Sequence, residues 1–322
     1  MKAKLVALSM AAVALAMAGC SNDENEEMDN WNGEIRLSSG VAVQTRANTQ
    51  AEYIQRGETV YAWVDKATTG ESYINAWTLT AQSNGSLTGN SKYYPTDDSD
   101  LNFYALHGNF VSSTFTENET EFPAPYVIHS VTADQSGAEN YAKSDLLYAV
   151  TKGVTRSSSA VKLQFYHMLS KVEVALKSGE GEPNLIGAIV TIEGTQLDAK
   201  FEPSKDEDMS DRQNRTDMIV AEGSLTSIKI WTAITADNFG TDTQYAEAVL
   251  VPGQELKAGA TFIKVKLQNN ATFSYKIDSE LKLESGMKYT YNITVNQSGL
   301  SVSSEIKNWD TAPYKEGEAT MD

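Results

Sequence analysis

The chain has 322 residues, of which 43 are acidic and 26 are basic, so its formal net charge at neutral pH is −17. A surface with this excess repels phosphate backbones and anionic lipid headgroups, which argues against nucleic-acid binding and against a polybasic membrane patch. The only cysteine is Cys20, so no intrachain disulfide can form. The fold must be stabilised by its hydrophobic core, which about 300 residues can supply as one large domain or two of ordinary size.

Residues 1–19 have the pattern of a secretory signal peptide. Lys2 and Lys4 form a charged start, an apolar run continues to Met17, and a pair of small residues precedes Cys20. The apolar run is too short to span a bilayer comfortably. The placement of the cysteine resembles a bacterial lipobox, so we expect Cys20 to accept lipid; the alternative is a small buried hydrophobe in a helix.

Residues 20–33 are predicted to form an acidic tether. Residues 21–27 carry several carboxylates and no apolar side chain to bury, which is typical of a solvated segment. The segment also resembles the acidic signal that sends some lipoproteins to the cell surface; the alternative is a spacer that faces the periplasm. With Cys20 lipidated, no thiol remains for a zinc site or a cysteine nucleophile.

The first strand is predicted between Glu34 and Thr45. Ile35, Leu37, Val41 and Val43 occupy odd positions and are separated mainly by small or polar residues, which is the period of a half-buried strand. A small, polar segment follows and should end the strand.

Further strand patterns follow, and they are separated by turn-rich loops. Before residue 158 they cover Thr59–Val64, Ala76–Ala81, Leu101–Leu106 and Leu146–Val150. A short helix is possible within Ser136–Ser144. Strands without intervening helical patterns favour an all-β fold of the sandwich type.

A polar stretch from Gly153 to Ser159 predicts a domain boundary. We expect an N-terminal β-sandwich domain over 34–158 and a C-terminal one over 159–322. The strand patterns of the second domain are Ile186–Ile192, Leu197–Phe201, Ile228–Ile234, Ala246–Val251, Ile263–Leu267, Phe273–Ile277, Lys288–Val295 and Leu300–Ile306.

The run from Val161 to Leu176 changes its apolar face. Apolar residues are odd-numbered up to Phe165 and even-numbered from Val172. A strand cannot exchange its faces without a bulge, a bend or a short helical turn. The chain should therefore bend between His167 and Ser170.

No pattern predicts catalysis, a metal site or a cofactor. His107, His129 and His167 are too far apart for a short metal-binding motif and are interpreted as structural residues. The acidic loop Asp206–Asp211 could bind calcium, but it lacks the glycine and the terminal glutamate of an EF-hand loop, so a solvated loop is the favoured interpretation. No nucleophile elbow, phosphate-binding loop or dinucleotide fingerprint occurs. We therefore expect a protein that is not an enzyme.

Three tryptophans allow two interpretations. Trp77, Trp231 and Trp309 could form a sugar-binding platform, or they could pack in the core of a β-sandwich. A surface glycan-binding lipoprotein is the alternative function that the first interpretation would support.

Several short segments, in order along nearly the whole chain, resemble the fimbrillin family, whose members are subunits of type V pili. They are the lipoprotein start, the strand that ends in Gln44–Ala47, the mid-chain run Phe165–Val172, the strand Tyr289–Val295, and the closing Ile306–Trp309. The resemblance implies two transthyretin-like β-sandwich domains and export as a lipoprotein of the outer membrane. It also implies removal of the first strand by an arginine-specific protease and polymerisation with other fimbrial subunits by donor-strand exchange.

Under this resemblance, residues 34–46 would be the removable strand and Arg46 the processing site, with Arg56 as a second candidate. Ile35, Leu37, Val41 and Val43 would be replaced by a strand from a neighbour on assembly. The lipid on Cys20 would leave with the excised piece.

The C-terminal segment departs from the pattern of a stalk subunit. Residues 308–322 contain Pro313, Gly317 and several charges, and they alternate poorly. Leu300–Ile306 would be a better donor strand, although its own domain could need it. A tip or accessory subunit of a surface fimbrium, with host or bacterial surface ligands as possible further partners, therefore fits at least as well as a stalk subunit.

Overall fold

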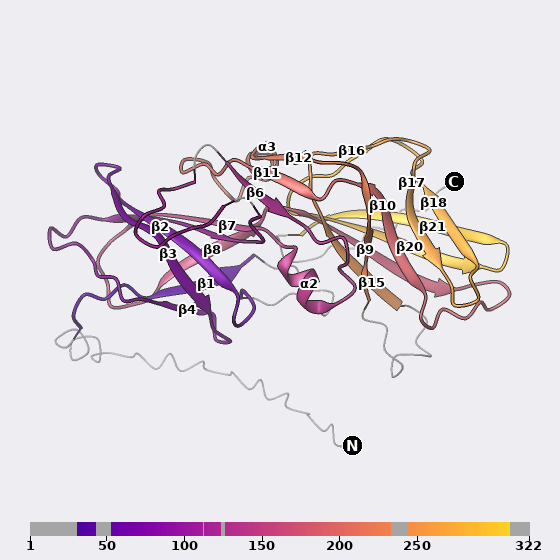
Figure 1. The fold of residues 1–322 in the computed structure, drawn as a ribbon, viewed down its shortest axis with the longest axis horizontal. Coiled ribbons are helices and arrows are strands. Elements are labelled where there is room, and N and C mark those ends of the chain that lie inside the picture. The colour runs from indigo at the N-terminus through magenta and orange to yellow at the C-terminus, as the bar shows by residue number, and fades with distance from the viewer. Residues whose placement is uncertain (1–30, 43–52, 112, 124–125, 233–243, 310–322) are drawn as a thin grey trace, which may run out of the picture.

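The computed structural model describes residues 31–42, 53–111, 113–123, 126–232 and 244–309. This part of the chain consists almost entirely of strands, with two short helices (Figure 1). The all-β prediction is confirmed, and no helix in the described part is long and apolar enough to cross a membrane.

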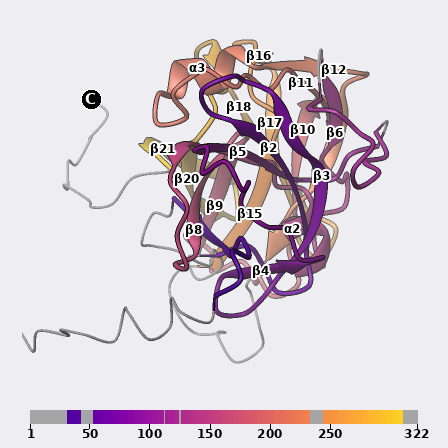
Figure 2. The same cartoon turned by 90° about the vertical axis from the view of Figure 1, so that its left-hand side faces the viewer.

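Seven strands from the first half of the chain form a closed barrel in the order β1-β4-β3-β2-β5-β7-β8. They occupy one end of the elongated molecule in Figure 1, and Figure 2 looks onto that end. All neighbours are antiparallel except β1 and β8, which are parallel. The strands are β1 (Leu37–Val41), β2 (Thr59–Lys66), β3 (Ser72–Ala81), β4 (Ser86–Gly89), β5 (Leu101–His107), β7 (Leu147–Val154) and β8 (Val161–His167).

Strand β2 illustrates why the apolar runs in this half are nearly continuous. Val60, Ala62 and Val64 lie in the cluster that fills the barrel. Trp63 points to the other side, where it belongs to the second and larger core cluster. A strand that is covered on both faces loses the alternation that a half-buried strand shows.

Two larger sheets form most of the second half of the chain. The four-stranded sheet has the order β13-β10-β17-β18, and the five-stranded sheet has the order β14-β15-β9-β20-β21. The strands are β9 (Ser170–Ser178), β10 (Ile189–Thr195), β13 (Thr226–Lys229), β14 (Trp231–Thr232), β15 (Gln244–Leu250), β17 (Thr261–Lys266), β18 (Thr272–Lys276), β20 (Met287–Asn296) and β21 (Gly299–Asn308).

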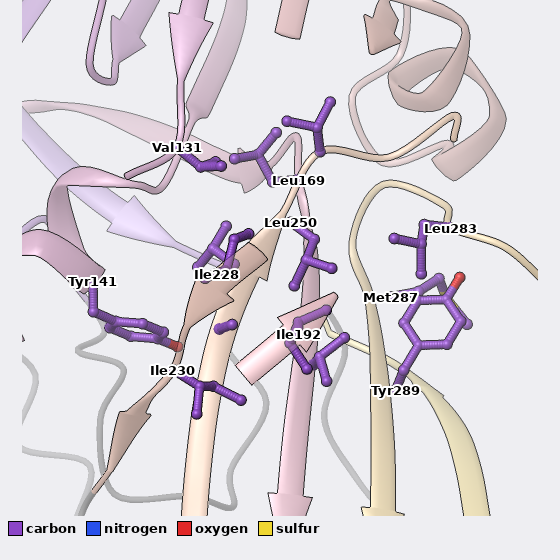
Figure 3. Packing of buried hydrophobic residues seen from close by; sticks show 14 of the residues in the cluster. Val131, Tyr141, Leu169, Ile192, Ile228, Ile230, Leu250, Leu283, Met287 and Tyr289 are labelled. Carbon is purple, nitrogen blue, oxygen red and sulfur yellow. The ribbon is translucent and has the colours of Figure 1, made fainter. Parts of the chain in front are cut away.

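The two larger sheets pack against each other through aromatic and aliphatic side chains. Tyr291 of β20 contacts Phe262 of β17 and Tyr275 of β18, with ring centroids 5.6 and 5.5 Å apart. Figure 3 shows Ile192 and Leu250 in the same cluster. These contacts place the second core between the sheets.

Smaller elements connect the two halves. Strand β6 (Val127–Ser130) precedes the barrel strands β7 and β8 in sequence, yet it joins a three-stranded sheet with β11 (Asp198–Phe201) and β12 (Ile219–Glu222). A two-stranded sheet contains β16 (Glu255–Leu256) and β19 (Leu281–Lys282), and the helices are α2 (Ala138–Lys143) and α3 (Arg212–Asp217). Helix α2 lies within the range where the sequence allows a short helix.

The bend predicted near His167 to Ser170 is confirmed. Strand β8 ends at His167 in the barrel, and β9 starts at Ser170 in the five-stranded sheet. The linking residues Met168 and Leu169 are fully buried. Strand β8 lies after the predicted boundary at residue 158, and it pairs with the barrel strands β1 and β7.

His129 is a structural histidine on β6. Its Nδ1 accepts a hydrogen bond from the amide of Asn109, and its Nε2 lies 3.0 Å from the carbonyl of Ser144, to which it donates. Burial disfavours the charged ring and lowers the pKa of His129 to about 4, although the Ser144 carbonyl opposes this effect. The neutral ring thus connects the C-terminal end of α2 to the segment that follows β5.

The buried ring predicts a loss of stability in mild acid. The pKa of His129 is about 4 in the folded chain, against an ordinary value of 6.5 for histidine. Between these values the unfolded chain binds more protons, so the free energy of unfolding should fall by roughly 3 kcal/mol as the pH decreases. His129→Gln removes this contribution. Urea unfolding between about pH 7 and pH 4 should show that the free energies of unfolding of the wild type and the variant become more similar as the pH falls. A constant difference between the two over this range would contradict the assignment.

Candidate functional site

Residues 33–42 run along the barrel wall between β4 and β8 and are hydrogen-bonded to the strands on both sides. Leu37 and Ser38 pair with β4, and all of β1 pairs in parallel with β8. The Ile35 amide donates to the carbonyl of Lys92 at 2.8 Å, and the Ala42 amide donates to that of Phe165 at 2.9 Å. This segment therefore closes the barrel.

The side chains of β1 fill the barrel interior. Ile35, Leu37 and Val41 are only 4, 3 and 8% exposed and belong to the interior cluster. Three of the four apolar residues of the predicted strand thus share the buried face, and Val43 lies outside the described residues.

Ser39 is a buried residue of β1 that the apolar pattern misses. It is 1% exposed, and its hydroxyl donates to the carbonyl of Gly85 at 3.1 Å. Its odd position in the alternation would have placed it on the inner face, because the period of a strand does not depend on polarity. A buried hydroxyl needs such a partner, and the bond adds a specific contact between β1 and the turn before β4.

An aromatic cluster fixes the chain where it enters β1. The Trp31 ring meets that of Tyr94 edge-on at 5.9 Å, and the Arg156 guanidinium lies 5.3 Å from the Trp31 ring centroid. The Trp31 indole also donates to the carbonyl of Glu34. The last residues of the predicted tether are therefore packed on the barrel.

A cavity of about 530 Å³ lies at the other end of β1. Val41, Ile54 and Leu147 give it apolar walls, and His107, His167, Asp145 and Arg56 are among its polar lining residues. His167 lies 2.9 Å from the Asp145 carboxylate, and the Trp309 ring stacks on it with the ring centroids 3.8 Å apart. Burial opposes ionisation of Asp145, yet the adjacent His167 holds the pKa of this carboxyl below its usual value.

The two arginine candidates differ in what the structure records. Arg46 and Cys20 lie outside the described residues. Arg56 is exposed, but it lies in a tight turn in which the Glu58 amide donates to the carbonyl of Gln55 at 3.1 Å. Ile54, two residues earlier, is 4% exposed and belongs to the barrel interior.

The metal and sugar interpretations gain no support from the described part of the chain. No group of three potential metal-ligating side chains occurs among these residues. In the acidic loop, Asp208 and Asp211 accept hydrogen bonds from the amides of Ser210 and Gln213, and Asp211 caps helix α3.

Two of the three tryptophans named for a sugar platform are core residues. Trp77 and Trp309 are 3 and 1% exposed, and the Trp77 indole donates to the carbonyl of Asn90. Nothing is described of the Trp231 side chain. A buried ring cannot stack on a sugar at the surface, so packing is the interpretation that the structure favours for both.

The burial of Leu37 predicts a large effect of truncation. Leu37→Ala should lower the free energy of unfolding by roughly 2–5 kcal/mol, because it removes buried methyl groups and leaves a cavity. Ser38→Ala is the matched control on the other face of the same strand, with an expected change within about 0.5 kcal/mol. Urea unfolding followed by tryptophan fluorescence measures both, and equal losses would show that β1 does not pack as described.

Comparisons with known proteins agree with this architecture. The profile of the fimbrillin-like family matches residues 45–309. A candidate fimbrium subunit of Bacteroides uniformis, Fim1C, is 24% identical over 320 residues, which cover 96% of this chain and 95% of that protein.

Two crystal structures of candidate cell adhesion proteins have a similar fold. The protein from Bacteroides ovatus is 16% identical, with a TM-score of 0.61 over 87% of this chain and 99% of that one. The protein from Bacteroides uniformis is 20% identical, with a TM-score of 0.57 over 86% of this chain and 100% of that one. On the strength of the family match, the chain belongs to the fimbrillin-like family.

Proposed function

We propose that this fimbrial subunit is exported as a lipoprotein through Cys20 and assembles by donor-strand exchange. Cleavage at Arg46 would release residues 33–42 from the barrel, and a strand of another subunit would take their place. The observation that carries the proposal is the position of β1, which closes the barrel between β4 and β8 and directly precedes the segment that contains Arg46.

The physical basis is the groove that β1 would leave. Without β1, the facing edges of β4 and β8 would have unpaired backbone groups, and buried side chains such as Leu87 and Val161 would be exposed. A donor strand that alternates apolar residues satisfies the same backbone groups and fills the same sites.

Cleavage would change how β1 is held rather than what it contacts. Ile35, Leu37 and Val41 each contribute roughly 1.5–3 kcal/mol by burial, so the strand stays in place while it is covalently joined. Once the chain is cut, β1 is held by contacts alone. A donor strand at high local concentration can then displace it.

Arg46 suits processing better than Arg56. A cut after Arg56 would place the buried Ile54 on the excised piece and would remove part of the barrel core. The residues near Arg46 are small and polar, which is typical of accessible cleavage sites.

The pairing of the last strand supports a tip or accessory role. Strand β21 contains Leu300–Ile306 and pairs with β20 over ten consecutive positions. The best donor candidate of the sequence is therefore used in its own sheet. We propose that the subunit accepts a donor strand without supplying one, within two transthyretin-like β domains on the outer membrane surface.

Lipidation at Cys20 predicts how the protein partitions between detergent and water. Cys20→Ser should move the unprocessed protein from the detergent phase to the aqueous phase, because no other cysteine can accept lipid. Detergent phase partitioning of whole-cell extracts measures this. Retention of the serine variant in the detergent phase would refute lipidation at Cys20.

The processing site predicts a difference between two arginine variants. Arg46→Ala should fold normally but resist release of the first strand, and it should form no ladder with co-expressed fimbrial subunits after treatment with an arginine-specific protease. Arg56→Ala is the matched control and should be processed and assembled as the wild type. Gel electrophoresis and N-terminal mass determination give the readout; normal assembly of Arg46→Ala would place the site elsewhere.

A further inference from the structure

The two packed sheets of the second half are covered along one pair of neighbouring edges. The Gln135 side chain donates to the carbonyl of Val249 and accepts from its amide, both at 2.8 Å, where β15 extends beyond the short β14. The Gln135 amide donates to the carbonyl of Lys229, and the Lys229 amide donates to that of Ala133, also at 2.8 Å. Residues 133–135 thus cover the edges of both β13 and β15.

The opposite side ends in β21, whose outer edge pairs with no strand among the described residues, although β18 packs close to β21. Strand β21 is the last strand of the five-stranded sheet and pairs with β20 alone. The pairing runs from Asn296 and Gly299 to Met287 and Asn308 without a register shift. Natural edges of this length are usually interrupted by a bulge or a proline or carry charged side chains. Strand β21 has no bulge or proline, and its charged residues Glu305 and Lys307 lie on the odd-numbered face, away from the core side.

The hairpin geometry defines which backbone groups of β21 face outward. Asn296 and Gly299 flank a two-residue turn and form its hydrogen-bonded pair. The odd-numbered residues from Gly299 to Lys307 therefore bond to β20. The even-numbered residues from Leu300 to Ile306 direct their amides and carbonyls away from the sheet.

The same even-numbered residues carry an apolar stripe. Val302 and Ile306 lie opposite Ile293 and Tyr289 of β20, whose side chains are in the core. Val302 is half-buried, but Ile306 is 52% exposed. The core side of the sheet is therefore incompletely covered at this edge.

We propose that a second copy of this chain pairs with β21, antiparallel and centred on Ser304. In this register Val302 of each copy lies opposite Ile306 of the other, so the exposed isoleucine gains an apolar cross-strand partner. Glu305 and Lys307 then lie opposite serines. A register centred on Glu305 would place two carboxylates directly opposite each other, which is unfavourable. A register centred on Ile306 would pair Glu305 with Lys307, but only residues 304–308 of β21 would overlap and Val302 would lie outside the pairing.

The pattern favours a second copy over another partner because it is self-complementary. Ser304 lies near the middle of β21, so an isologous pairing centred on it overlaps residues 300–308 of both copies and also places Val302 opposite Ile306. The contact does not depend on cleavage of β1, since β21 belongs to a different sheet at the other end of the molecule (Figure 1).

Cysteine crosslinking tests the register directly. In Cys20→Ser protein, which has no other thiol, Ser304→Cys should form a disulfide-linked dimer under mild oxidation. The two Cα atoms would be about 5.5 Å apart at the centre of the pairing, within the range of a disulfide. Ser301→Cys is the matched control and should remain uncrosslinked, because the two copies of residue 301 would lie roughly 20 Å apart. Equal crosslinking of both variants, or of neither, would overturn the proposal.

Sedimentation of the same Cys20→Ser protein measures the association itself. The protein should form dimers reversibly at concentrations up to on the order of 100 μM. Ile306→Lys should raise the dissociation constant of the dimer at least about tenfold. Ile189→Lys, at a comparably exposed isoleucine on β10, should leave it unchanged. A monomeric parent protein, or equal dimerisation of both lysine variants, would overturn the proposal.

A backbone variant separates edge pairing from side-chain effects. Ser304→Pro removes one outward amide and leaves the bonds to β20 intact, so it should also weaken the dimer, whereas Ser304→Thr should not. Arg46→Ala should dimerise as its parent does, so loss of strand exchange and loss of this contact are distinguishable. Circular dichroism confirms folding, and if Ser304→Pro unfolds, the lysine and cysteine variants decide.

Discussion

Barrel closure in the first half of the molecule depends on five residues, the strand β1. Of the seven barrel strands, only β1 comes from before the segment that contains Arg46, and the other six follow that segment. Its parallel pairing with β8 and its antiparallel pairing with β4 satisfy two edges at once. Removal of β1 would therefore open a gap in a closed ring of hydrogen bonds rather than shorten a sheet.

The closing strand is coupled to the second half through β8. Only Met168 and Leu169 separate β8 from β9, and both are fully buried. The Ser285 hydroxyl donates to the carbonyl of Met168, and the Gly286 amide donates to that of Leu169, so the link is fixed to the turn before β20. The strand that lies beside the exchange groove is thus anchored at one end in the five-stranded sheet. A rigid anchor of this kind would preserve the proposed groove for an incoming strand.

Sequence patterns predicted the faces of strands well and their neighbours poorly. The alternation before Thr45 placed Ile35, Leu37 and Val41 on one face, and all three are buried. Period alone cannot predict that β1 is parallel to β8 or that β6 pairs with β11, because these partners are far apart in the chain. Strand β4 was missed because it is only four residues long and follows a turn-rich segment.

The two strands at the ends of the described chain have opposite environments. An unpaired edge invites association with any available strand, and β1 keeps the edges of β4 and β8 paired for as long as it stays in the barrel. Association through that groove would then require proteolysis and would follow export. No strand in the described part of the chain pairs with the outer edge of β21, so association there would need no processing. Because the two edges belong to different sheets, one protease step could control fibre growth without affecting lateral contact between subunits.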